Sequence, residues 1–223
     1  MTTLIYRTAS EVNDAMIRVY NNMFLAVVNS MIVAMLVSSS MTLMQFLFTG
    51  VTKWLVIFAP LVVVFIIGAR MQSMSRSQAQ LALHAFAALM GLSLSSIFVV
   101  FTATSITTAF MGAAALFGTM SVYGWFTRRD LTSLGQFMFV GLIAIVIASV
   151  INVFVGNGTA SMVISALAII IFLGLTAWDT QRIRETVSQD GYDSNSEIVG
   201  ALSLYLNFIN IFTSLLNLFG ERE

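Results

Sequence analysis

The second apolar segment of the chain contains Leu61-Val62-Val63-Val64-Phe65-Ile66-Ile67, a run with no polar side chain on any face. Strands of a transmembrane barrel alternate polar with apolar residues, so this run excludes that architecture. On either side the apolar residues continue over 54–70, a stretch that includes Pro60, the only proline, and ends at Arg70. A segment of this length and polarity predicts a transmembrane helix.

The composition extends this prediction to the whole chain. Of its 223 residues, 58% are hydrophobic and 9% are charged, whereas a soluble domain carries roughly 25% charged residues. We therefore expect an integral membrane protein whose surroundings are the lipid bilayer. Ten basic residues balance ten acidic ones, which leaves no basic stripe for nucleic acid. With no cysteine and a single histidine, His84, thiolate and histidine metal clusters are excluded, and no resident cofactor is expected.

Six more apolar segments follow the same pattern, so the sequence predicts an all-α polytopic membrane protein with seven transmembrane helices. The expected spans are 23–44, 54–70, 79–101, 108–126, 134–155, 162–179 and 199–219. Residues 1–22 then form an N-terminal segment, 23–219 the seven-helix domain and 220–223 a C-terminal tail.

The basic residues indicate the orientation. Seven spans would place eight of them on the same side of the membrane as the N-terminus and two on the opposite side. The eight are Arg7, Arg18, Arg70, Arg76, Arg128, Arg129, Arg182 and Arg184, and the two are Lys53 and Arg222. The positive-inside rule predicts a cytoplasmic N-terminus. Seven crossings of the cell inner membrane then predict a C-terminus on the outer side of that membrane. A seventh helix that dips in and returns would leave the C-terminus inside, and the sequence leaves that alternative open.

Few polar residues occur in or beside the spans, and ionisable groups at membrane depth are costly, so each is a functional candidate. Arg70 ends the second span and Asp179 the sixth. Each has a structural alternative, Arg70 as a snorkelling anchor and Asp179 as an interfacial residue. Asn207 and Asn210 in the seventh span are typical of hydrogen bonds between helices, as is His84 in the third.

Two other features have both a functional and a structural interpretation. Pro60 deletes the hydrogen bond to the carbonyl of Val56, so it predicts either a hinge that moves Arg70 or a static kink. Asp190, Asp193 and Glu197 gather oxygen ligands in one loop, but they lack the spacing of an EF-hand, so we expect a solvated polar turn there.

Several membrane activities are excluded by missing residues. The sole lysine, Lys53, lies in a loop, so no span offers a Schiff-base lysine for retinal. An HExxH zinc motif and a P-loop are also absent from the sequence. We therefore expect no enzyme activity and no catalytic residue.

Three motifs resemble those of the Bax inhibitor family, also called the transmembrane Bax-inhibitor-motif family. They are MSVYGWFTRRDLTSLG at 120–135, GLTAWDTQRI at 174–183 and ALSLYLNFIN at 201–210. The chain looks like a bacterial member of that family. The resemblance implies two layers of three helices around a central seventh helix and a pH-sensitive calcium leak. It also implies a cytoprotective or quality-control role, because some bacterial relatives bind a membrane-bound protease.

The resemblance further implies a site. In the family, two aspartates on helices six and seven sense pH, with an arginine on helix two as an exchangeable partner. Asp179 matches the first aspartate and Arg70 the arginine, but Asn207 stands where the second aspartate is expected. The site predicted here is therefore a pH sensor and gate of Asp179, Asn207 and Arg70, with Pro60 as hinge and Asp179 as the residue that attracts calcium.

The leading interpretation is a pH-sensitive calcium leak channel. The alternative is a non-conducting regulator that binds a membrane protease or another membrane protein, with the N-terminal segment as its handle. Asn207 in place of aspartate removes half the negative charge, which strengthens the alternative and predicts a shallow, one-proton pH response.

Overall fold

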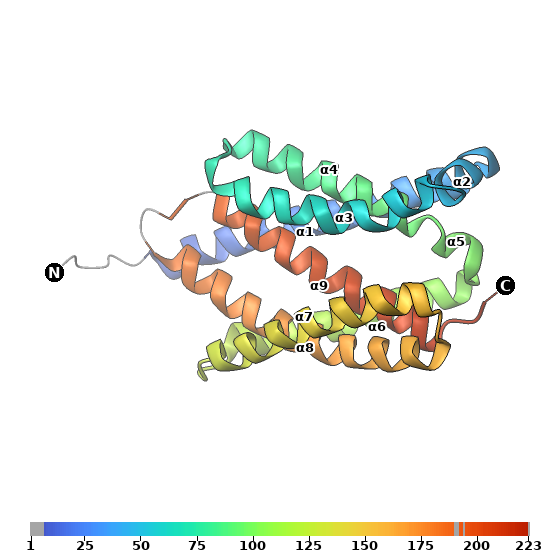
Figure 1. The fold of residues 1–223 in the computed structure, drawn as a ribbon. Coiled ribbons are helices and arrows are strands. Elements are labelled where there is room, and N and C mark those ends of the chain that lie inside the picture. Colours follow the sequence, from blue (N-terminus) through green and yellow to red (C-terminus); the bar gives the residue numbers. More distant parts are fainter. Residues whose placement is uncertain (1–6, 190–191, 194, 223) are drawn as a thin grey trace. The chain divides into compact units, whose positions relative to one another are not determined.

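The structure, a computed structural model, describes residues 7–189, 192–193 and 195–222 (Figure 1). In these ranges the predicted all-α class is confirmed: no strand is present, and an isolated bridge pairs Phe101 with Arg222. The helices are α1 (Ala9–Ser38), α2 (Met41–Phe48), α3 (Thr52–Arg70), the 3-10 turn η1 (Met71–Ser73), α4 (Arg76–Leu94), α5 (Ile97–Val100), α6 (Ala103–Phe126), α7 (Thr132–Val155), α8 (Gly158–Ser188) and α9 (Asn195–Phe219).

Seven of these helices, with α4 and α5 taken together, are long and apolar enough to cross a membrane, which is the predicted number. The first span differs from its prediction. The predicted segment 23–44 runs across a break, because α1 ends at Ser38 and the Ser40 side chain caps α2 by accepting a hydrogen bond from Leu43 N–H. Residues 9–22, expected ahead of the first span, belong to α1, which begins at a capping box between Thr8 and Glu11.

The chain divides into two compact units, and α9 contributes to both. The first unit comprises Met1–Thr102, Val187–Tyr205 and Arg222–Glu223, and the second comprises Ala103–Thr186 and Leu206–Glu221. Each unit therefore holds three candidate spans and one half of α9. The apolar window of α9 is 67% buried, against 39% or less in the other spans. A continuous α9 of 25 residues also differs from the alternative in which this segment dips in and returns.

In the first unit, α4 packs against both α1 and α3. A Cβ on Gly91 of α4 would lie 2.6 Å from the carbonyl oxygen of Ser30, so the α1 and α4 backbones touch there. The Ser30 hydroxyl is 2.9 Å from the Ala87 carbonyl oxygen and 2.6 Å from the Tyr205 hydroxyl, and so joins α1, α4 and α9. At His84 the two helices are also joined through the main chain, because Asn29 Nδ2 donates to the His84 carbonyl at 2.8 Å, and the side-chain bond expected of His84 stays a prediction.

Pro60 lies buried inside α3, and its effect on the backbone is compensated from α4. The Val56 carbonyl, which loses its usual helical donor to the proline ring, accepts a 2.6 Å hydrogen bond from the Ser93 hydroxyl. Neighbouring serine side chains are a known way to satisfy such freed carbonyls in membrane helices. The proline position is therefore a point of attachment between α3 and α4, and movement about it stays a prediction.

In the second unit, small residues bring α6 and α7 against α8. A Cβ on Gly124 of α6 would lie 2.2 Å from the carbonyl oxygen of Ala177, and one on Gly135 of α7 would lie 2.2 Å from the Trp178 ring. At the α6–α9 contact, Phe110 and Phe117 meet Phe208 edge to face, with ring centroids 5.4 and 5.7 Å apart. The contacts of Ala177 and Trp178 fix the backbone of α8 just before Asp179.

Candidate functional site

Asp179 is the centre of a small polar cluster in the second unit. Its side chain is 7% exposed, and Asn207 Nδ2 of α9 donates a 2.8 Å hydrogen bond to its Oδ2 oxygen. The other carboxylate oxygen, Oδ1, lies 3.0 Å from Nη2 of Arg182, one turn further along α8. A buried carboxylate therefore has both an amide donor and a cation, which are the partners that burial of a charge requires.

The position of the cluster follows from the length of α8. The helix has 31 residues, or roughly 46 Å at 1.5 Å per residue, and the hydrocarbon core of a bilayer is about 30 Å thick. Counting from Gly158, Asp179 falls close to the far boundary of that core. Arg182 lies one turn beyond, where its guanidinium stacks 4.6 Å from the Trp178 ring centroid and is 45% exposed.

The two asparagines of α9 have different partners, although both were expected to join helices. Asn207 links α9 to α8 through Asp179, as predicted. Asn210 Nδ2 instead donates to the Leu206 carbonyl of its own helix at 2.7 Å, so that expectation is wrong for Asn210.

Arg70 lies at the end of α3 in the first unit, as predicted, and its side chain is exposed. From the sequence we expect Arg70 to be the base best placed to pair with Asp179. That expectation is wrong, because Arg182 already supplies a positive charge to the carboxylate. Pairing between Arg70 and Asp179 stays a prediction.

A calcium-attracting role for Asp179 also stays a prediction. Among the described residues, no three histidine or acidic side chains come together in a group that could hold a metal ion. In the cluster, Asp179 is held by Asn207 and Arg182, and Asn207 stands where the resemblance implies a second aspartate.

Glu197 is the main polar residue whose surroundings differ from those predicted from the sequence. It was expected in a solvated turn, but its side chain is fully buried in the first unit. Arg18 of α1 approaches both carboxylate oxygens, with its Nη2 2.6 Å from Oε1, and Arg76 of α4 lies 2.9 Å from Oε2. The Tyr192 hydroxyl donates to Oε1 as well. Glu197 thus ties α1, α4 and the start of α9 together, while Asp190 lies outside the described residues.

Gln181 is a second residue that sequence reasoning missed as a positioning group. It is buried, its Oε1 accepts the Leu131 N–H at 2.9 Å, and its Nε2 donates to the Arg129 carbonyl at 2.9 Å. Both partners belong to the turn between α6 and α7. Because one buried amide satisfies two main-chain groups, that turn is held against α8, and the only sequence signal was the Trp-Asp-Thr-Gln order of the motif.

These features define a class of protein: a multi-pass helical membrane protein with seven candidate spans and a buried carboxylate held by an amide and a guanidinium. Comparison with known proteins narrows that class. The family model described as "Inhibitor of apoptosis-promoting Bax1" matches residues 12–223, and the chain belongs to this Bax inhibitor family.

Relatives match over most of the chain. It is 38% identical over 214 residues to "Inner membrane protein YbhL" of Escherichia coli K12, covering 93% of this chain and 92% of the relative. An uncharacterized protein of Rickettsia prowazekii is 36% identical over 211 residues, covering 93% and 89%. An uncharacterized membrane protein of Streptococcus pyogenes is 43% identical over 145 residues, covering 62% and 61%.

Proposed function

We propose that the protein is a pH-sensitive calcium leak channel of a bacterial inner membrane. The observation that carries this proposal is the buried carboxylate of Asp179 on a membrane-spanning helix, hydrogen-bonded to Asn207 at 2.8 Å. Ionisable residues at such positions mark ion pathways in membrane proteins. The membrane assignment is supported by the relative named as an inner membrane protein.

Asp179 has the chemistry that both parts of the proposal need. An ionised carboxylate is a hard oxygen ligand that attracts Ca²⁺, the transported ion, and protonation removes that attraction. Protonation also removes the ion pair with Arg182. Asn207 can donate to a carboxylate or accept from a carboxylic acid, so the α8–α9 contact persists in both states. The response is therefore that of one proton, and shallow.

In this proposal α3 supplies the gate. Arg70 exchanges with Arg182 as partner of Asp179, and α3 moves about Pro60 to allow it. The N-terminus faces the cytoplasm and the C-terminus the outside, in accord with the distribution of basic residues.

A second function is favoured by one observation. The Asp179 carboxylate already has a cation and an amide, so the cluster is satisfied without a transported ion. A non-conducting regulator that binds a membrane protease would need no more than that. Deletion of the N-terminal segment, the expected handle for a partner, does not separate the two functions. Removing residues 1–18 also removes Arg18, which pairs with Glu197, and the buried residues Ala15 and Met16 of α1, so the fold itself would be disturbed.

Calcium flux into proteoliposomes separates them. Wild type should leak Ca²⁺ with a shallow pH dependence, Asp179→Asn should lose that dependence, and Asn207→Asp should steepen it by adding a coupled carboxylate. Asn210→Asp is the matched control: among the described residues Asn210 bonds to its own helix, so its substitution should leave the slope unchanged. Folded wild-type protein without flux would reject the channel and favour the regulator.

A further inference from the structure

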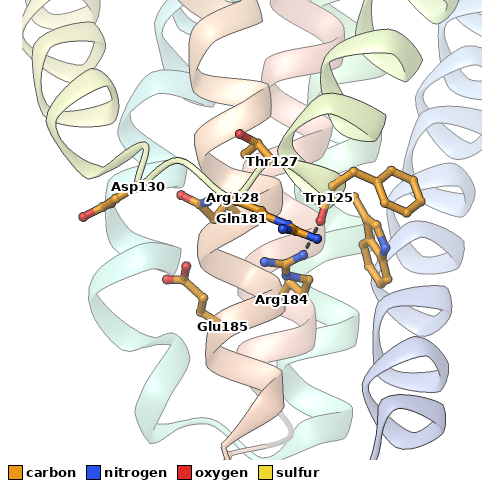
Figure 2. Close-up of a pocket in the computed structure, with 8 residues that line it drawn as sticks. Trp125, Thr127, Arg128, Asp130, Gln181, Arg184 and Glu185 are labelled. Carbon is orange, nitrogen blue, oxygen red and sulfur yellow. Dashed lines mark hydrogen bonds between the residues drawn. The ribbon is translucent and has the colours of Figure 1, made fainter.

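An open pocket of about 410 Å³ lies in the second unit, between the end of α6 with the turn that follows it and the C-terminal part of α8 (Figure 2). Its charged lining consists of Arg128 and Asp130 from the turn and Arg184 and Glu185 from α8. Gln181, which holds the turn, lines it as well, so the walls of the pocket are fixed by the two hydrogen bonds described above.

The two kinds of charge are separated across the pocket. Figure 2 shows the guanidinium groups of Arg128 and Arg184 turned toward one side and the carboxyl groups of Asp130 and Glu185 toward the other. Arg184 is positioned by donating to the Trp125 carbonyl, and Arg128 has no hydrogen-bond or ion-pair partner among the described residues. Two guanidinium groups presented together form a bidentate donor set that matches a phosphate.

The acidic side is also preorganised. Asp130 is exposed, and its Oδ1 accepts the Thr132 N–H at 2.8 Å. Hydrogen bonding from Thr132 lowers the pKa of Asp130, so the carboxylate is ionised at neutral pH. The pocket thus offers two positive and two negative groups. Because these charges sum to zero, the pocket as a whole does not attract a ligand that is purely anionic.

The position of the pocket relative to the bilayer indicates a membrane lipid as the source of its ligand. Gln181, Arg184 and Glu185 lie roughly 35 to 40 Å along α8 from Gly158, which is beyond a hydrocarbon core of about 30 Å and within the headgroup region. Phe126, which also lines the pocket, is 73% exposed and lies on the membrane side of the turn. Polar headgroup atoms and an acyl chain would therefore meet polar and apolar surface in the right order.

We propose that this pocket binds the headgroup of an aminophospholipid, with the phosphate on Arg128 and Arg184 and the ammonium group on Asp130 and Glu185. A primary ammonium group has three donors for the carboxylates, whereas a choline group has none. An anionic headgroup without an ammonium group would leave both carboxylates facing negative charge. The pocket is thus selective for phosphatidylethanolamine over phosphatidylcholine and phosphatidylglycerol.

The test uses the full chain, delipidated in detergent, with each of the three lipids added at equal mole fraction. Lipid retained in native mass spectrometry and the midpoint of thermal unfolding are the two measurements. Wild type should retain phosphatidylethanolamine roughly tenfold better than the other two lipids, and only this lipid should raise the midpoint. Soluble glycerophosphoethanolamine should not reproduce the shift, because it lacks the acyl chains.

Arg128→Gln and Glu185→Gln should each abolish the preference, and their exposed positions leave the fold intact. Arg129→Gln is the matched control, since Arg129 is the adjacent exposed arginine and does not line the pocket. Equal retention of the three lipids, a preference for phosphatidylglycerol, or an equal loss in Arg129→Gln would overturn the proposal. A full shift with the soluble headgroup would overturn the lipid as its source.

Discussion

Asp179 keeps a carboxylate at the edge of the hydrocarbon because two side chains divide its oxygens, with Asn207 on Oδ2 and Arg182 on Oδ1. An isolated charge there would cost several kcal/mol. The two ionic partners differ in exposure, 7% for Asp179 and 45% for Arg182, so the cation keeps much of its hydration. Their pair is therefore worth more than a surface ion pair and less than a fully buried one.

The first prediction tests this pair with a double-mutant cycle. Arg182→Gln and Asp179→Asn should each lower the midpoint of thermal unfolding in detergent. The double variant should lose less than the sum of the two, because it leaves no unpaired charge. The coupling should be about 0.5 to 1.5 kcal/mol, the lower part of the range for contacting residues. Additive losses would mean that the ion pair has no energetic weight.

Sequence reasoning succeeded for the elements wherever lipid imposes a simple rule. A span must be apolar over about 20 residues, so the number and order of the seven spans followed from hydropathy alone. The start of α1 did not, because Glu11, Asp14 and Arg18 lower the mean hydropathy of a segment that is nonetheless helical. Capping by Thr8 and burial of neighbouring residues decide that start.

The candidate site was predictable only in part, for a similar reason. Asp179 and Asn207 lie in motifs whose order along the chain identifies them, and the structure joins them by a hydrogen bond. Glu197 could not be predicted, because its two arginine partners lie 179 and 121 residues away in the sequence. Long-range pairing of this kind leaves no local pattern.

The second prediction concerns the contact of α6 with α8. Gly124→Ala should destabilise the protein by about 1 to 3 kcal/mol, because its Cβ would meet the Ala177 carbonyl oxygen at 2.2 Å. Gly118→Ala, six residues earlier in α6, is the control. Nothing lies within 4 Å of its Cβ, so it should be neutral or slightly stabilising. Thermal unfolding of the two variants gives the comparison, and equal midpoints would contradict the close packing.

The third prediction concerns Pro60 and the serine that compensates it. Ser93→Ala alone should cost about 0.6 to 1.7 kcal/mol, since it leaves the Val56 carbonyl without a donor. In a Pro60→Ala background the helix supplies its own N–H to that carbonyl. Ser93→Ala should then cost almost nothing. Unfolding midpoints of the wild type, the two single variants and the double variant complete the cycle, and the same cost in both backgrounds would refute the compensation.

At the scale of the molecule, the first unit has two distinguishable ends. Arg18 and Arg76 meet on Glu197 at the start of α4, whereas Arg222 lies over the Phe101 ring, with its guanidinium carbon 5.7 Å from the centroid, after α4 and α5 have run the length of a span. The basic residues near Glu197 belong to the set of eight that predicts the cytoplasmic side. The C-terminal Arg222 therefore lies at the other end of this unit.

The last prediction follows from that arrangement and from the absence of cysteine in the chain, which makes every single-cysteine variant a unique label site. Ser133→Cys places an exposed thiol at the start of α7, Thr159→Cys places one at the start of α8, just past the other end of α7, and Glu221→Cys places one just after α9. In intact spheroplasts a membrane-impermeant maleimide should label Thr159→Cys and Glu221→Cys. Ser133→Cys should react only after permeabilisation, because the positive-inside rule predicts that Arg128 and Arg129 place this turn in the cytoplasm. The pair at the ends of α7 controls for access, since one of the two must be protected if α7 spans. Protection of Glu221→Cys together with Ser133→Cys would place the C-terminus in the cytoplasm and reject seven complete crossings.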